Sequence, residues 1–400
     1  MVVYFAFLFH IYQPPTQIPI VIKQIVNESY NPIFAAITNN LNAKLTLNIN
    51  GTLTEQLHDF GYDNLIDTIK DLASKGQIEF TGSGKFHPLL PLIPEPEVNR
   101  QINLNRETNR HFFGKVYNPR GFFPPEMAVS KEIFEIVKKL GFDWIIMSGI
   151  ANTLPEFPTN YISVHPNGLR LLFRDDYISI DCAFDKINNV DSFIKRLYYK
   201  NTSMDYYVIL AMDGETFGHH VKHAIDNFLI PLFESLSNRN DIKICTISEI
   251  VDKFPKGFVQ IPRASSWSTM PYDLATDVPF PLWFNPNNEI HIEQHKFFMF
   301  ALTMIHLSSK YRDSMDDEKK RIFDNARNLL DRGIHSCQQW WASQRPWYSP
   351  DMILRGLNEI LMASVNTKRS IPENLIDIND ALDLILKNML KAHNKIVLSL

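Results

Sequence analysis

Cysteine is scarce in this chain, and this scarcity excludes a disulfide framework and a thiolate metal site. Only three cysteines occur in 400 residues, Cys182, Cys245 and Cys337, and they lie far apart in the sequence. A disulfide framework or a thiolate metal site needs more cysteines at closer spacing. We therefore expect three reduced, buried thiols.

An excess of positive charge is also missing. Forty Lys and Arg residues stand against 44 Asp and Glu residues, which gives a formal net charge of −4. Proteins that bind nucleic acid or an anionic membrane carry a basic surface, because the phosphates supply much of the affinity. We expect neither nucleic acid nor a membrane as a partner.

Long apolar runs are absent as well, since no stretch reaches the roughly 18 residues that a membrane-spanning helix needs. The first residues, MVVYFAFLFHIYQPP, are apolar enough to resemble the core of a signal peptide. They lack a basic leader and a cleavage site of small residues. We expect a first buried strand here and a cytoplasmic protein.

Alternating strand and helix patterns fill the first 260 residues. The strand-like runs are apolar on both faces, as in a parallel sheet that is covered on both sides. A further pair of runs, 169–176 and 177–184, is interpreted as an inserted hairpin. The seven expected strands cover residues 2–9, 44–50, 78–84, 118–125, 144–149, 206–214 and 242–247.

Helical patterns separate these strands. Residues 64–76 end at a glycine, and residues 130–141 begin after a serine that suits an N-cap. Repeated strand-helix units predict either a barrel or an open doubly wound sheet. A barrel of this kind takes about 250 residues, which matches the segment.

The pattern changes in the last third of the chain. Long amphipathic helices are expected over 293–311 and 317–343, with no convincing strand. The stretch from Pro255 to Pro286 is rich in proline and aromatic residues, which indicates ordered irregular chain. We predict an α/β domain over 1–260, a connection over 261–290 that contributes to the site, and a helical domain over 291–400.

Polar side chains follow five of the expected strands. In parallel α/β folds the functional residues gather at the carboxyl ends of the strands. A single His or Asn at such a place usually caps a turn, but five polar ends together favour a site. The residues concerned are His10 and Gln13, Asn48 and Asn50, Lys85 and His87, Glu126, and Asp213 with Glu215.

Two acids on separate strand ends, Glu126 and Asp213, fit the hydrolysis of a glycosidic bond. One carboxylate attacks or positions water, and the other carboxyl group protonates the leaving oxygen. Tryptophans in the second half of the chain point the same way, because flat aromatic faces suit sugar rings; the alternative is that they seal the two domains together. They are Trp267, Trp283, Trp340, Trp341 and Trp347.

Five motifs in order, FHIYQPP, GSGKFHPLLPLIP, GFFPPEMAVS, MDGETFGHH and SSWST, resemble the signature regions of glycoside hydrolase family 57. They span some 260 residues and are followed by QQWWAS and RPWY. The resemblance implies an incomplete TIM-like barrel of seven β/α units followed by a C-terminal helical bundle. It also implies a retaining enzyme that acts on α-glucans or related α-linked sugars, with no cofactor or metal.

The resemblance assigns roles to single residues. Glu126 matches the family's nucleophile and Asp213 its general acid/base, while His10, His87 and Trp267 match positions that line the sugar site. Further substrate-binding residues are expected at Gln13, Asn50, Glu215, His220, Trp283 and Trp341. The sequence departs from the family pattern at Tyr12, where many members carry a second His, and at Phe122-Phe123, where a Trp often precedes the Pro-Glu element.

Several activities share such a catalytic pair. We favour an α-amylase type hydrolase of α-1,4 links, with α-1,6 debranching, 4-α-glucanotransfer and action on an α-galactoside as alternatives. A metal-dependent carbohydrate deacetylase is another class, since His219 and His223 have helical i, i+4 spacing and could join Asp213 in a zinc site. A carbohydrate-binding protein without turnover is the third class.

Overall fold

The computed structural model describes residues 1–200 and 202–400, and the chain forms two compact units. The first unit consists of Met1–Lys85 and Glu95–Trp267. The second consists of Phe86–Pro94 and Ser268–Leu400. Strands are confined to the first unit, as far as the described residues extend, and the second is helical.

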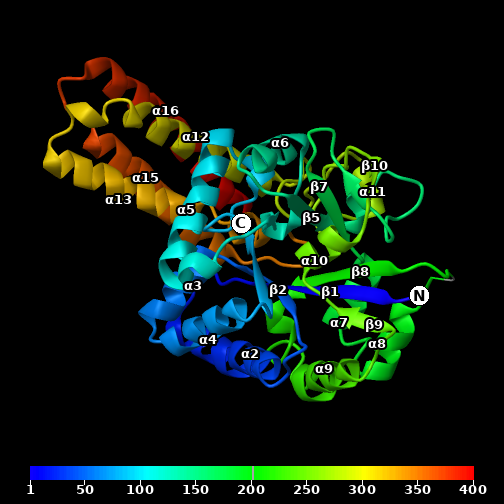
Figure 1. Cartoon of the computed structure of the whole chain (residues 1–400). Coiled ribbons are helices and arrows are strands. Elements are labelled where there is room, and N and C mark those ends of the chain that lie inside the picture. The colour runs from blue at the N-terminus through cyan, green and yellow to red at the C-terminus, as the bar shows by residue number, and fades with distance from the viewer. Residues whose placement is uncertain (201) are drawn as a thin grey trace. The chain divides into compact units, whose positions relative to one another are not determined.

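One curled sheet organises the first unit (Figure 1). Its order is β10-β6-β7-β5-β4-β3-β2-β1-β8, and β9 pairs with β1. Every pairing is parallel except β6 with β7. The strands are β1 Val3–Ile11, β2 Leu45–Ile49, β3 Ile78–Gly82, β4 Gly121–Phe122, β5 Trp144–Ser148, β6 Ile162–Val164, β7 Arg170–Arg174, β8 Tyr206–Asp213, β9 Ile242–Ile244 and β10 Lys256–Val259.

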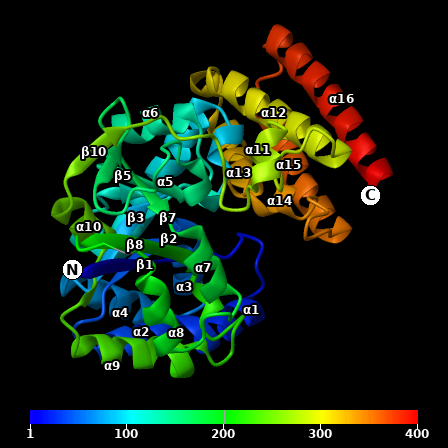
Figure 2. The same ribbon diagram turned by 90° about the vertical axis from the view of Figure 1, so that its right-hand side faces the viewer.

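The sheet is an incomplete (β/α)7 barrel. Seven neighbouring parallel strands run in the order β8, β1, β2, β3, β4, β5 and β7. Directly after β7, the Asp175 amide donates to the Ile209 carbonyl of β8 at 2.8 Å. Helices α2, α4, α8 and α9 lie together against one side of this sheet (Figures 1 and 2). The helices of the unit are α1 Pro19–Ile25, α2 Asn31–Thr38, α3 Gly51–Asp59, α4 Asp63–Ser74, α5 Glu95–Phe113, α6 Lys131–Lys139, α7 Asp176–Ala183, α8 Val190–Leu197, α9 Ile230–Ser237 and α10 Ile247–Lys253.

The seven expected strands and the expected helices over 64–76 and 130–141 are confirmed. The expected hairpin over 169–184 is wrong in its second half. Residues 170–174 form β7, whereas residues 176–183 form helix α7. The Asp175 side chain caps this helix by accepting from the Ile178 amide, and Asp176 adds a second acid to the first turn. An N-cap and an acidic first turn favour helix over the alternating apolar pattern. β7 instead pairs antiparallel with β6, a strand that the sequence patterns did not indicate.

Side chains alternate strictly between the two faces of the central strands. In β1, Phe5, Phe7 and Phe9 pack outward among the helices, whereas Ala6 and Leu8 belong to the cluster inside the barrel. The same rule operates in β8, where Tyr207, Ile209 and Ala211 face inward. Because the period of a strand is two, the next inward positions are His10 in β1 and Asp213 in β8. These two residues are register partners at the carboxyl end.

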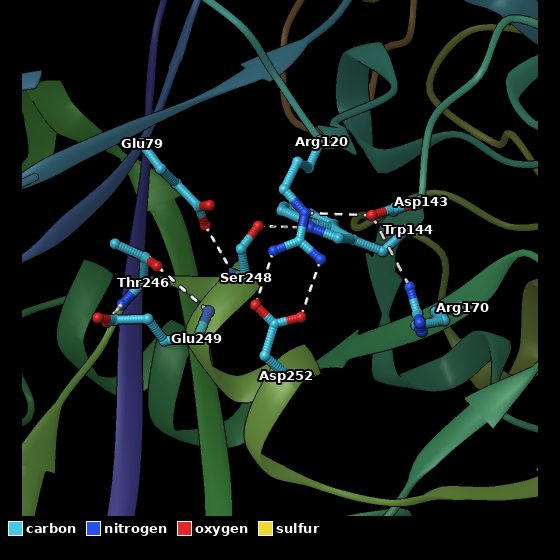
Figure 3. A network of polar contacts seen from close by, with 9 residues as sticks. All are labelled: Glu79, Arg120, Asp143, Trp144, Arg170, Thr246, Ser248, Glu249 and Asp252. Carbon is cyan, nitrogen blue, oxygen red and sulfur yellow. Dashed lines mark hydrogen bonds and ion pairs between the residues drawn. The ribbon is translucent and has the colours of Figure 1, made fainter.

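At the amino end of helix α10, polar side chains accept hydrogen bonds from the first backbone amides (Figure 3). The Glu79 carboxylate accepts from the Ser248 amide at 2.9 Å and from the Thr46 hydroxyl at 2.8 Å. The Trp144 indole donates to the Ser248 hydroxyl at 3.0 Å. An acid at a helix amino terminus meets the positive end of the helix dipole. Burial nevertheless raises the pKa of Glu79.

We expect Glu79→Ala to lower the free energy of unfolding by about 1 to 3 kcal/mol, because the Ser248 amide and the Thr46 hydroxyl lose their buried acceptor. Glu79→Gln keeps an acceptor oxygen and removes a buried charge, so its effect should stay under about 1 kcal/mol. Glu234→Ala, at an exposed position of α9, is the control. Denaturant unfolding measures all three, and equal losses for the two Glu79 variants would contradict this account.

The second unit is built from helices, with α13 beside α15 and α12 beside α16 (Figures 1 and 2). The expected helix over 317–343 is broken: α13 ends at Gly333 and α14 starts at Cys337. In the break the Ser336 amide donates to the His87 carbonyl at 2.9 Å. The helices are α11 Pro271–Ala275, α12 Glu289–Ser309, α13 Asp317–Gly333, α14 Cys337–Trp340, α15 Pro350–Ser370 and α16 Ile376–Ser399.

None of the three cysteines, which all lie in the described ranges, forms a disulfide. Cys182 is buried as expected, but Cys245 and Cys337 are partly exposed, so the prediction of three buried thiols is wrong for two of them. Across residues 1–200 and 202–400, no helix has the length and apolar content needed to cross a membrane.

Candidate active site

Inward-facing polar residues line the barrel where its strands end. They continue the rows of apolar side chains below them, and neighbouring strands are in register at this level. His10 is paired with Asn48 on one side and with Asp213 on the other, while Ser148 is paired with Arg174. The polar end of the barrel is thus a direct consequence of strand alternation.

Glu126 lies in a strained turn just after β4. It has φ 60°, and Met127 beside it has φ 50°, so two consecutive residues with side chains occupy the left-handed region. Such conformations cost of the order of 1 kcal/mol or more each and persist only where the surroundings hold them. Here the amides of Met127 and Ala128 donate to the carbonyls of Pro124 and Pro125. Strain of this kind occurs preferentially at functional sites.

Trp267 holds Glu126 at two points. Its indole nitrogen donates to the Glu126 carboxylate at 3.0 Å, and its backbone amide donates to the Glu126 carbonyl at 3.1 Å. A short bridge between Val129 and Ser265 joins the same two segments. The carboxylate is therefore oriented by a fixed donor, and it remains partly exposed.

Asp213 is the last residue of β8 and is also partly exposed. Burial of its surroundings raises the pKa of this carboxyl, and the positive charge of Arg174 acts in the opposite direction. The Arg174 guanidinium lies 5.7 Å from the centre of the Trp267 ring. Arg174 thus lies beside the tryptophan that orients Glu126 and exerts its charge on Asp213.

His10 fills the space between these groups. Its ring stacks on Phe123 at 4.9 Å between centres and meets Trp267 edge-on at 6.0 Å. Its Nδ1 lies 2.7 Å from the Asn48 side-chain oxygen and donates to it. Burial lowers the pKa of His10 to about 4, so the ring is neutral near neutral pH. A neutral, oriented imidazole suits hydrogen bonding to a hydroxyl group.

Glu215 lies two residues after Asp213 but is only 5% exposed. Gln13 donates to its Oε1 at 3.0 Å, and the Tyr30 hydroxyl donates to the same oxygen. Burial and the nearby charge of Asp213 raise the pKa of Glu215. Both Gln13 and Glu215 are therefore engaged with protein groups, and their expected contact with sugar stays a prediction.

Asn50 and His220 occupy different environments. Asn50 is fully buried and donates to the Gly84 carbonyl, which ties the end of β2 to the end of β3. His220 lies in an exposed turn, where its amide donates to the Glu215 carbonyl at 2.9 Å. Contact of either residue with a substrate remains a prediction.

The helical face expected for His219 and His223 is wrong, because residues 218–220 and 222–223 form turns. The Nδ1 of His219 lies 2.6 Å from the Glu28 carboxylate. Within the described ranges, no group of three or more His, Cys, Asp or Glu side chains is arranged to hold a metal ion.

Three expected sugar-binding residues belong to the second unit. His87 is 1% exposed, has φ 56°, and its Nδ1 lies 2.9 Å from the Ser336 hydroxyl. Trp341 is 8% exposed and meets His335 edge-on at 5.5 Å, and Trp283 is 1% exposed. These contacts all lie inside the helical unit, and sugar binding by the three residues stays a prediction.

Sequence reasoning missed two groups near Glu126 and Asp213. Arg174 ends β7 and is 6% exposed, and its side chain donates to Asp176 at 2.7 Å. The rule that functional residues end parallel strands would have found it if 169–176 had been taken as a strand of the main sheet. Tyr30 left no comparable signal, because it follows no strand and lies far from Glu215 in the chain.

The chain belongs to glycosyl hydrolase family 57, whose model matches residues 10–262. It is 25% identical over 284 residues to an alpha-amylase of Pyrococcus horikoshii, a match that covers 68% of this chain and 43% of that protein. It is 23% identical over 288 residues to a 4-alpha-glucanotransferase of Thermococcus kodakarensis, with 68% and 42% covered. The chain thus spans less than half of the length of these two curated relatives.

Solved structures share the fold. An exo-type maltose-forming amylase from Pyrococcus sp. ST04 superposes with a TM-score of 0.75 at 14% identity, over 96% of this chain and 83% of that one. The similarity supports the incomplete barrel followed by helices that the chain itself displays.

Proposed function

We propose that this protein is a retaining glycoside hydrolase that cleaves α-1,4 links of α-glucans, with Glu126 as nucleophile and Asp213 as general acid/base. The observation that carries the proposal is the position of Trp267. It donates to Glu126 and lies against Arg174, whose charge acts on Asp213. Two partly exposed acids from separate strand ends are thereby linked to one aromatic side chain.

The chemistry follows from the state of each acid. Glu126, with an indole donor on its carboxylate, attacks the anomeric carbon while Asp213 gives its proton to the departing oxygen. Because its pKa is raised, the Asp213 carboxyl keeps this proton closer to neutral pH and can donate it. Asp213 then takes a proton from water, the water oxygen bonds to the anomeric carbon, and the bond to Glu126 breaks. Two displacements leave the anomeric configuration unchanged.

The choice of α-glucan rests on the relatives, which are named as alpha-amylases and 4-alpha-glucanotransferases. Glucan transfer is the second candidate, since it uses the same glycosyl-enzyme and differs only in whether water or a sugar hydroxyl accepts. Debranching of α-1,6 links and action on an α-galactoside share the catalytic pair as well.

Product analysis on amylose, pullulan and maltotriose tests the proposal. We expect maltooligosaccharides from amylose, a steady gain of reducing ends, and the α-anomer as the first product seen by NMR. Chains longer than the substrate from maltotriose would favour transfer, and rapid cleavage of pullulan would favour debranching. Affinity for glucans without any turnover would identify a binding protein, and deacetylation that is lost on chelation would identify a deacetylase.

A further inference from the structure

Arg174, the last residue of β7, connects two parts of the site through its buried guanidinium. One terminal nitrogen donates to the Ala211 carbonyl of β8 at 3.4 Å, and the other donates to the Trp267 carbonyl at 3.4 Å. Ala211 and Asp213 lie on the same face of β8, because side chains alternate along a strand. The guanidinium therefore lies next to the strand end that carries Asp213.

Asp176 holds this guanidinium from the opposite side. The Nε of Arg174 donates to the Asp176 carboxylate at 2.7 Å. The same carboxylate accepts from the Ser148 hydroxyl at 2.8 Å and from the Ile150 amide at 3.1 Å, so it is itself held by the end of β5. All three nitrogens of the Arg174 guanidinium thus have acceptors in the protein. A planar cation held in this way is oriented before any substrate binds.

The charge of Arg174 acts on the Asp213 carboxyl. Burial raises the pKa of Asp213, and the positive charge of Arg174 limits this rise. A general acid/base releases its proton in the first displacement and takes a proton from water in the second. Burial favours the protonated form in both steps. A nearby cation favours the carboxylate, which is the form that the second step needs.

We propose that Arg174 is a positioning residue that keeps a fixed positive charge beside Asp213 and thereby stabilises the Asp213 carboxylate between the two displacements. The inference rests on the proposed function, in which Asp213 is the general acid/base. It adds the group that lets a buried acid also serve as a base.

Other titratable groups surround the Asp213 carboxyl. His10 of β1, its register partner, is neutral near neutral pH because burial lowers its pKa to about 4. Tyr30 ends the π-helical turn η1 (Val26–Tyr30) and stays neutral as well, because burial raises its pKa well above the usual value. Glu215 follows on the same segment, and Glu126 lies in the turn after β4. These acids are unchanged in the variants used below, so they do not account for a difference between variant and wild type.

Two further acids lie at the start of α7, which packs against β8. Asp175 accepts from the Ile178 amide as the helix cap, and Asp176 is the partner of Arg174. Removing the guanidinium would leave the Asp176 carboxylate without its cation. An uncompensated negative charge also favours a protonated Asp213, so both consequences of the removal raise the pKa of Asp213.

The variant Arg174→Met removes the charge and keeps an unbranched side chain. We expect the alkaline limb of the kcat/KM profile on amylose to shift up by roughly 0.5 to 1 pH unit, because this limb reports the general acid of the free enzyme. Arg174→Lys keeps the charge without the planar fork of donors. Its limb should shift by less than half as much as that of Arg174→Met.

Arg170→Met is the matched control. Arg170 begins the same strand and lies 3.8 Å from the Asp143 carboxylate (Figure 3). It is four residues before Arg174, or about 13 Å along the strand, so its profile should equal that of the wild type. Thermal denaturation shows whether each variant folds. If Arg174→Met does not fold, Arg174→Gln decides by the same measurements, because its amide can still donate to the Ala211 carbonyl.

A second readout needs no substrate. The Asp213 carboxyl is followed by 13C NMR in protein labelled at aspartate and is assigned by its absence from Asp213→Asn. An upward shift of its titration in Arg174→Met or Arg174→Gln supports the inference even if the wild type cleaves no α-glucan, in which case only the proposed function fails. A folded charge-free variant whose Asp213 titration and alkaline limb equal those of the wild type would overturn the inference, even if its rate were lower, and would leave the glycosidase intact.

Discussion

Replacing Glu126 by glutamine should lower kcat on amylose by on the order of 10⁴-fold or more. The amide has the size of the carboxylate but cannot form the covalent glycosyl-enzyme. The Trp267 indole, 3.0 Å from the carboxylate, can still donate to the amide oxygen, so the turn should keep its conformation. Initial rates, with binding of maltooligosaccharide measured by calorimetry, separate lost chemistry from lost affinity.

The truncated variant Glu126→Ala gives a sharper result. It leaves room for a small anion, and azide should restore part of the turnover of an activated α-glucoside. The product should be the β-glucosyl azide, because azide attacks from the face that Glu126 occupied. Glu132→Gln, at an exposed position of α6, is the control and should keep wild-type rates. Near-normal turnover by Glu126→Gln would remove this residue from the mechanism.

The second large effect is expected for Asp213→Asn. Loss of the general acid should reduce kcat on amylose by roughly 10² to 10⁴-fold. The loss in kcat/KM should be much smaller on α-glucosyl fluoride than on amylose, because fluoride leaves without a proton and kcat/KM reports only the first displacement. The ratio of the two rates therefore reports the role of this carboxyl directly. The asparagine side chain also has no proton to lose in this pH range, so the alkaline limb of the profile should disappear.

Asp226→Asn provides the control for this second variant. Asp226 is an exposed acid of the π-helical turn η7 (Ile225–Leu229), and its replacement should leave both rates and the pH profile unchanged. An equal loss on amylose and on the fluoride in Asp213→Asn would point to a general disturbance of the site instead of a missing acid. The two expected results together define a covalent nucleophile and a proton donor.

Much of the barrel was predictable because its signals are local. Apolar runs such as residues 2–9 and 206–214 mark covered strands, and the period of two places His10 and Asp213 on the inner face. The errors arose where short patterns compete. Residues 177–184 alternate like a strand, but the cap at Asp175 makes them a helix. The spacing of His219 and His223 suits a helix, but the chain turns there around Gly218.

The contacts of the site depend on residues that are remote in sequence. Trp267 orients Glu126 from 141 positions away, and Tyr30 reaches Glu215 across 185. No periodicity links such pairs, because their proximity is produced by the curling of the sheet and by the turn at η1. Arg174 belongs to the site because β7 pairs with β5, a pairing that the sequence patterns did not predict.

By itself the sequence determined seven of the strands, the family resemblance and the two acids, since each of these depends on neighbouring residues. The tertiary structure alone decided which groups act on those acids: the Trp267 indole on Glu126 and the Arg174 guanidinium near Asp213. The reason is that burial and charge act through space. The short distances between these acids and their neighbours exist only in the folded barrel.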